Sequence, residues 1–128
     1  MKKMFKKEGI DKREIIKKRA QFIKIFKKCK RIDSENIRIY FTENENEKEI
    51  SRFSVVTGKK LGKAVLRNRV KRIIKEVYRK NKEYFGMGIN WIFIPQGKWE
   101  KIKYNNAERL ILDVIKGIKK KKGIKRIQ

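Results

Sequence analysis

Histidine is absent from this chain of 128 residues, and cysteine and proline occur once each. The lack of histidine excludes an imidazole-based catalytic triad and a histidine metal site. Cys29 alone forms neither an intrachain disulfide nor a multi-cysteine zinc site, so we interpret it as structural or incidental and expect a reducing compartment. No run approaches the ~20 apolar residues of a membrane-spanning helix, and no apolar signal core follows the basic N-terminus. We therefore expect a cytoplasmic protein.

Acidic residues are also scarce. The chain has 39 Lys and Arg against 14 Asp and Glu, which gives a formal net charge of +25. A charge this large opposes compaction by self-repulsion, and a polyanionic partner relieves it. Nucleic acid is the leading candidate because neutralising phosphates releases counterions, and an anionic membrane surface is the rival. The hydrophobic fraction of 39% is low but sufficient for one folded domain with polar ends.

Apolar periodicity predicts an α+β fold. Spacings of three and four residues predict helices over 14–30, about 62–81 and about 104–118. Alternation predicts strands over 36–42 and 51–57, and a nearly continuous apolar run predicts a covered strand over 89–94. Helices that pack on one sheet form a two-layer sandwich.

The segments between and beyond these elements are polar. The acidic segment 43–49 is predicted to be a hairpin loop between the first two strands, and Asn105–Asn106 the N-cap region of the last helix. One domain is expected over 1–118, with residues 1–13 flexible. Residues 119–128 are expected to form a basic, disordered tail.

The segment 59–72 concentrates cations on an ordered apolar pattern. Seven of its fourteen residues are Lys or Arg. A helical projection at ~100° per residue gathers the apolar side chains on one arc; these are Leu66, Val70, Ile73, Ile74, Val77 and Tyr78. The adjacent arc holds Arg67, Asn68, Lys71, Arg72, Lys75 and Arg79, while Arg69 falls on the far side near Glu76. Acidic partners at i,i+4 are few, which favours a polyanion-binding helix over a solvated face. Gly62 and the helix N-terminus favour close approach of a phosphate.

The pattern Lys59-Lys60-x-Gly62-x-Ala64-Val65-x-Arg67-Asn68-Arg69-x-Lys71-Arg72 resembles the signature of the bacterial ribonuclease P protein subunit. The order of elements is similar to that of this family from about residue 10 to about residue 118. The resemblance implies a mixed four-stranded sheet packed by helices in the order α-β-β-β-α-β-α, with a left-handed β–α–β crossover. That hand departs from the general rule for such crossovers.

The resemblance also implies a function. The chain would be the protein component of a ribonucleoprotein endoribonuclease that removes the 5′ leader of precursor tRNA. The catalytic groups and the Mg²⁺ would belong to the ribonuclease P RNA, with no catalytic residue and no metal site in the protein, and the isolated protein would be inactive. The implied partners are ribonuclease P RNA and precursor tRNA, with one protein per RNA and no membrane.

Two sets of site residues follow from the resemblance. Residues that match the signature would bind the catalytic RNA, namely Lys59, Lys60, Arg67, Asn68, Arg69, Lys71 and Arg72. A cleft between the first helix and the open sheet face would bind the 5′ leader through Phe22, Phe26, Arg38, Tyr40, Lys71 and Lys75. Aromatic side chains beside cations suit single-stranded nucleic acid. The two Phe residues fit a plain core equally well, and a shift of one residue would make Phe41 the cleft aromatic in place of Tyr40.

Two positions depart from the family pattern. Gln96 stands near the place of a usual Arg after the last strand, and Arg38 replaces a usual apolar residue. Three other function classes compete with this interpretation. A ribosomal or other structural RNA-binding protein would share the composition but not the signature. A lipid-binding protein would need a long amphipathic helix, and a protein nuclease would need clustered carboxylates, whereas Glu43, Glu45, Glu47 and Glu49 are scattered in a loop.

Overall fold

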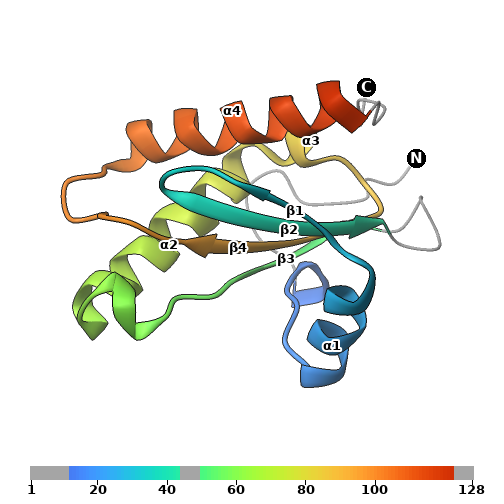
Figure 1. The fold of residues 1–128 in the computed structure, drawn as a ribbon, viewed down its shortest axis with the longest axis horizontal. Helices are drawn as coiled ribbons and strands as arrows, with labels where there is room; N and C mark the ends of the chain where they lie inside the picture. The colour runs from blue at the N-terminus through green and yellow to red at the C-terminus, as the bar shows by residue number, and fades with distance from the viewer. Residues whose placement is uncertain (1–11, 44–49, 123–128) are drawn as a thin grey trace.

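The computed structural model describes residues 12–43 and 50–122, and it places the side chains of residues 13–43 and 50–118. Helices lie on both faces of one central sheet (Figure 1). The strands are β1 (Lys30–Asp33), β2 (Ile37–Glu43), β3 (Arg52–Val55) and β4 (Ile89–Pro95). The α-helices are α1 (Arg19–Lys28), α2 (Ala64–Lys80), α3 (Lys82–Phe85) and α4 (Tyr104–Lys122). Short 3-10 helices are η1 (Lys12–Glu14) and η2 (Lys59–Leu61).

The sheet has the strand order β1-β2-β4-β3. β2 pairs antiparallel with both β1 and β4, whereas β3 pairs parallel with β4, and α2 and α3 form the crossover between that parallel pair. This is the mixed four-stranded sheet that the resemblance implies; the hand of the crossover stays a prediction. β4 separates β2 from β3, so the predicted hairpin between strands 36–42 and 51–57 is wrong. Its predicted loop falls largely on 44–49, outside the described residues.

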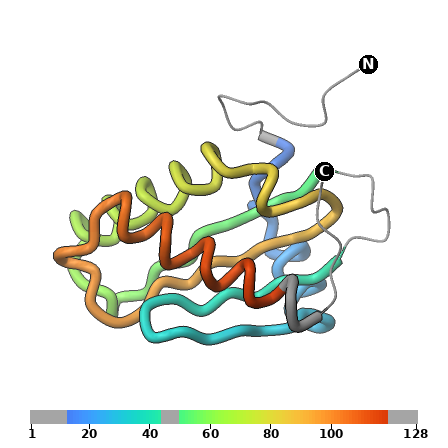
Figure 2. The backbone as a smooth tube through the Cα atoms, turned by 90° about the horizontal axis from the view of Figure 1, so that it is seen from above, coloured from blue at the N-terminus to red at the C-terminus, as the bar shows by residue number. Residues whose placement is uncertain are grey.

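The first face of the sheet carries the main core. Alternation along β2 turns Ile37, Ile39 and Phe41 to this face, and each is at most 3% exposed. α2 and α4 lie side by side over it (Figure 2) and bury their apolar faces against it. The predicted apolar arc of α2 is confirmed, because Val70, Ile74, Val77 and Tyr78 are buried and Leu66 and Ile73 pack against the core.

The second face carries α1. A separate, smaller cluster joins Ile25 of α1 to Ile92 of β4 and to Ile16 ahead of the helix. Phe22, Cys29, Tyr40 and Ile94 pack against it, so Cys29 contributes to packing as the sequence suggested. Tyr40 thus lies on the face opposite Phe41, which excludes the alternative register.

The ends of several elements differ from the sequence-based prediction. The first helix covers 19–28 and not 14–30, because Ile15 and Ile16 pair with Phe53 and because 30–33 form β1. Asn105 and Asn106 lie inside the first turn of α4, where Ala107 N–H donates to the Lys103 carbonyl, so they are not its N-cap. The helix continues through Lys122, so the predicted tail from 119 is helical over its first four residues, and 123–128 lie outside the described residues. Of residues 1–13, which were predicted to be flexible, 12 and 13 belong to η1, and 1–11 lie outside the described residues.

Candidate nucleic-acid interface

The signature segment begins with a tight turn into α2. Leu61 is 6% exposed and anchors η2, while Lys59 and Lys60 beside it are exposed. Gly62 follows with φ of 147°, a conformation that L side chains rarely adopt, and a Cβ there would lie 2.7 Å from Leu66 Cδ2. No side chain caps the α2 N-terminus, and its first turn holds no acidic residue. The exposed lysines therefore precede a helix end whose partial positive charge is not offset locally.

The cations of α2 divide between two flanks of the helix. Arg67, Lys71 and Lys75 follow one flank, and Asn68 and Arg72 point outward beside them. Among residues 13–43 and 50–118, no ion pair involves any of these side chains or Lys59 and Lys60. The cations of the predicted arc other than Arg79 are therefore available to an external anion. Arg79 differs, because its Nε donates to Glu76 Oε1 at 3.0 Å and this contact lowers the pKa of Glu76.

Arg67 is half-buried. Its Nε is covered by protein and has no hydrogen-bond partner in the part of the chain that the structure describes. A covered guanidinium N–H without an acceptor is uncommon, because desolvation of the group is then uncompensated. Among the described residues, the Nε–H of Arg67 is therefore an unsatisfied donor beside the other cations of this flank.

Arg69 lies on the opposite flank and faces the loop before α4. Its guanidinium donates to three backbone carbonyls, those of Ile102 at 2.8 Å and of Trp99 and Glu100 at 3.4 Å. The sequence placed Arg69 away from the cationic arc, and the structure agrees. What sequence reasoning missed is that this side chain holds a loop about thirty residues further along the chain. Its predicted contact with the catalytic RNA stays a prediction.

A second candidate surface lies between α1 and the second face of the sheet. Phe26 of α1 is 44% exposed and meets the half-buried Tyr40 of β2 edge to face, with ring centroids 5.0 Å apart. Phe22 lies one helical turn before Phe26 and is partly buried against Ile25 and Ile92. We call Phe22, Phe26, Arg38 and Tyr40 the α1 surface. Phe22 thus serves the core in part, while Phe26 and Tyr40 present aromatic rings beside it.

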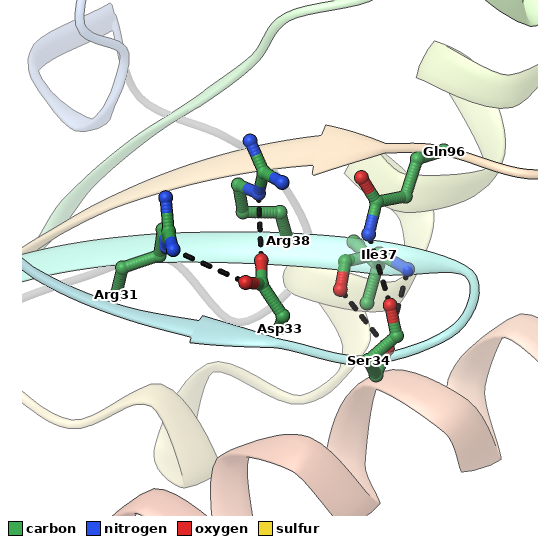
Figure 3. A network of polar contacts seen from close by, with 6 residues as sticks. All are labelled: Arg31, Asp33, Ser34, Ile37, Arg38 and Gln96. Atoms are coloured by element: carbon green, nitrogen blue, oxygen red, sulfur yellow. Dashed lines mark hydrogen bonds and ion pairs between the residues drawn. The ribbon is translucent and has the colours of Figure 1, made fainter.

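Arg38 is held by an acidic residue on the neighbouring strand. Arg38 Nε lies 2.6 Å from Asp33 Oδ1, and Arg31 Nε lies 3.4 Å from Asp33 Oδ2 (Figure 3). The hydrogen bond to Asp33 raises the pKa of Arg38, which stays charged. The β1–β2 pairing brings Asp33 opposite Arg38 and Arg31 opposite Tyr40, on the face that carries α1. Sequence reasoning missed Arg31 and Asp33 because it did not recognise β1.

Gln96 has a structural role in the loop after β4. Its Nε2 donates to the Ser34 carbonyl at 2.9 Å (Figure 3). Its backbone N–H donates to the Asn36 carbonyl. Trp99 Nε1 also donates to the Asn36 carbonyl, at 3.0 Å. The loop after β4 is therefore bonded to the β1–β2 turn, and the Gln96 side chain is used within the protein.

A cluster of polar side chains joins the end of α2 to the start of α4. Asn81 Nδ2 and the Tyr104 hydroxyl both donate to Glu108 Oε2, at 2.8 and 2.9 Å. These bonds lower the pKa of Glu108, whereas burial, followed by the Glu108 contact, raises the pKa of Tyr104 to about 12. Lys80 Nζ lies 5.1 Å from the centre of the Tyr104 ring. All of these side chains face one another, so the cluster stabilises the packing of α2 on α4.

Within the described residues, no three His, Cys, Asp or Glu side chains form a group that could hold a metal ion. No described helix is both long enough and apolar enough to cross a membrane.

An uncapped helix end, a row of cations without acidic partners and an aromatic surface on the other face of the sheet are features that suit binding of nucleic acid. Residues 10–120 match the family model described as Ribonuclease P. The chain is 32% identical over 109 residues to the ribonuclease P protein component of Petrotoga mobilis, covering 82% of this chain and 91% of that protein. It is 30% identical over 115 residues to the corresponding protein of Thermotoga maritima, covering 87% of this chain and 97% of the relative.

Solved structures agree with these sequence matches. The RNase P protein from Thermotoga maritima superposes with a TM-score of 0.73 at 30% identity, covering 82% of this chain and 97% of that one. A Staphylococcus aureus RNase P protein mutant, described as defective in mRNA degradation activity, superposes with a TM-score of 0.76 at 29% identity, covering 84% and 90%. The chain belongs to the ribonuclease P protein family. Its role is therefore in tRNA 5′ processing, as a protein subunit of ribonuclease P.

Proposed function

We propose that the basic helix α2 binds the catalytic RNA of ribonuclease P and that the α1 surface binds the 5′ leader of precursor tRNA. The observation that carries the first assignment is the row of cations without acidic partners on one side of α2, directly after an uncapped helix start. Phosphates would replace the missing counter-charges. The residues assigned to direct contact with the catalytic RNA are Lys59, Lys60, Arg67, Asn68, Lys71 and Arg72. Arg69 of the same signature would act indirectly, by holding the loop before α4 through its three carbonyl contacts.

The edge-to-face pair of Phe26 and Tyr40 supports the second assignment. Both rings are partly open to solvent, and Arg38 stands on the same sheet face as Tyr40. Bases that stack on aromatic rings, with phosphates near a cation, are bound without dependence on their sequence. That property suits a leader whose sequence differs among tRNA precursors. Lys71 and Lys75, on the flank of α2 turned away from Arg69, would add charge along the leader.

The RNA is proposed to carry the chemistry. The Mg²⁺ that the reaction uses is proposed to be held mainly by the RNA, and within the described residues no three His, Cys, Asp or Glu side chains form a group that could hold a metal ion. The protein's own residues bind and orient the two RNAs. We expect the isolated protein to cleave neither precursor tRNA nor mRNA, the latter being the activity named for the Staphylococcus aureus relative.

One protein per catalytic RNA, acting in the cytoplasm, completes the proposal. The experiment is 5′ processing of a precursor tRNA by a bacterial ribonuclease P RNA at low magnesium, with and without the protein. Cleavage at the mature 5′ end that appears only when the protein is present supports the proposal. Tight RNA binding without restored cleavage would favour a structural RNA-binding protein. Cleavage by the protein alone, without ribonuclease P RNA, would refute the assignment of chemistry to the RNA.

A further inference from the structure

A fully buried ion pair joins the start of the described chain to the crossover helix. Lys82 Nζ lies 3.0 Å from Glu14 Oε2 and donates to Oε1 at 3.1 Å, and the two side chains are only 4% and 1% exposed. Burial of two charges is costly, and their attraction offsets that cost only when the geometry is good. Apolar residues often stabilise such a position as well as an ion pair does. What an ion pair adds is a single defined placement of the two segments that it joins.

The segment that carries Glu14 lies along the outer edge of β3. Ile15 forms a parallel bridge with Phe53, and Ile16 N–H donates to the Phe53 carbonyl at 2.8 Å. Arg52 Nε also donates to the Arg13 carbonyl, at 3.2 Å. We call residues 13–16 the N-terminal strap. Glu14 therefore fastens this strap to the first residue of α3.

The strap leads almost directly into α1. Only Lys17 and Lys18 separate Ile16 from the helix, and the backbone N–H groups of both donate to Gln21 Oε1 at 3.2 and 3.0 Å. Ile16 itself is buried with Ile25 and Ile92 beneath α1. A connection this short and this well bonded transmits a shift of the strap to α1. The rings of Phe22 and Phe26 would then move relative to Tyr40.

We propose that Glu14 and Lys82 are positioning residues for the 5′ leader of precursor tRNA, which they influence through the strap and α1. The inference rests on the leader-binding function proposed above for the α1 surface. The cations assigned to the catalytic RNA lie before α2 or in its first half: Arg72, at the middle of the helix, still precedes Lys82 by ten residues, or roughly 15 Å along a helix. Loss of the ion pair should therefore weaken leader binding and spare binding of the catalytic RNA.

The experiment uses holoenzyme assembled from the full chain and a bacterial ribonuclease P RNA. Two variants are compared with the wild type, Lys82→Met and the milder Glu14→Gln, which keeps an acceptor for the lysine. Ile111→Ala is the control, because it removes a buried side chain of α4, which packs on the face of the sheet opposite α1. Affinities are measured for a precursor tRNA and for the same tRNA without its leader, at a temperature where circular dichroism shows each variant folded.

We expect the preference for precursor over mature tRNA to fall by about fivefold or more in both ion-pair variants, as when one base no longer stacks. The control should keep the wild-type preference, and affinity for the catalytic RNA should stay unchanged. If Lys82→Met does not fold, Glu14→Gln decides. Unchanged preference in a folded ion-pair variant overturns the inference, as does an equal loss in Ile111→Ala. Absence of any preference in the wild type would instead overturn the leader-binding function itself.

Discussion

Arg69 and Arg72 belong to the same cationic signature, yet the structure predicts opposite effects of replacing them. Arg69 donates to the Ile102 carbonyl at 2.8 Å and to two further carbonyls at 3.4 Å, whereas Arg72 is exposed. Hydrogen bonds that involve a charged group contribute roughly 1.5–3 kcal/mol to stability, and the two longer bonds add little. Arg69→Met should therefore lower the free energy of unfolding by about 2 kcal/mol, and Arg72→Met should leave it almost unchanged.

The assay combines thermal unfolding with RNA binding at several salt concentrations. For a domain of this size, the loss in Arg69→Met corresponds to a fall in Tm of roughly 8 °C. Each phosphate contact that is lost lowers the slope of log affinity against log salt by about 0.7–0.9. Arg72→Met should lose one such contact with the catalytic RNA, while Arg69→Met keeps the wild-type slope. The reasoning is refuted if Arg69→Met lowers the slope as Arg72→Met does and keeps the wild-type Tm, because the guanidinium would then contact RNA.

Three further changes test other parts of the structure. Tyr40→Ala should weaken binding of precursor tRNA by about 1–3 kcal/mol and leave binding of mature tRNA unchanged. Tyr84 is exposed and serves as the control, and an equal loss of binding in Tyr84→Ala would contradict this role of Tyr40. Gly62→Ala should lower the free energy of unfolding, measured in urea, by about 1–3 kcal/mol, because Gly62 has a positive φ. Gly58→Ala is the control, because Gly58 has a negative φ and open space for a Cβ, and equal losses in the two variants would refute the strain argument. The lowered pKa of Glu108 means that its stabilising contribution is present at neutral pH and is lost as pH falls through the folded-state pKa. Glu108→Gln should therefore lose less stability than the wild type on acidification to about pH 4, and parallel unfolding curves would count against that role.

The basic helix illustrates how much of a site can be predicted from local pattern. A helix has a fixed angular step, so the spacing of Val70, Ile74 and Val77 specified its buried side, and the position of Arg72 followed from the same geometry. Alternation along β2 likewise separated Tyr40 from Phe41, because neighbouring residues of a strand face opposite sides of a sheet. Both predictions depend only on residues close together in the sequence.

Several predictions that failed concern backbone pairing between strands. Residues 14–18 have a helical period, yet Ile15 and Ile16 pair with Phe53, and a backbone partner on a sheet edge outweighs local propensity. Residues 30–33 carry little strand pattern of their own, and they form β1 because β2 lies beside them. The hairpin predicted between 36–42 and 51–57 failed for the same reason, since β4 inserts between those strands.

The amino-acid sequence by itself determined the cationic charge, the amphipathic helix that concentrates it and the family to which the chain belongs, because these depend on composition and short-range spacing. Only the tertiary structure decided which of these cations remain available to bind an external anion. Arg69 holds a loop, Arg38 is held by Asp33, and Lys82 is buried against Glu14, whereas Arg72 faces solvent. These side chains carry the same charge, and what distinguishes them is the acceptor that the fold places within hydrogen-bonding distance.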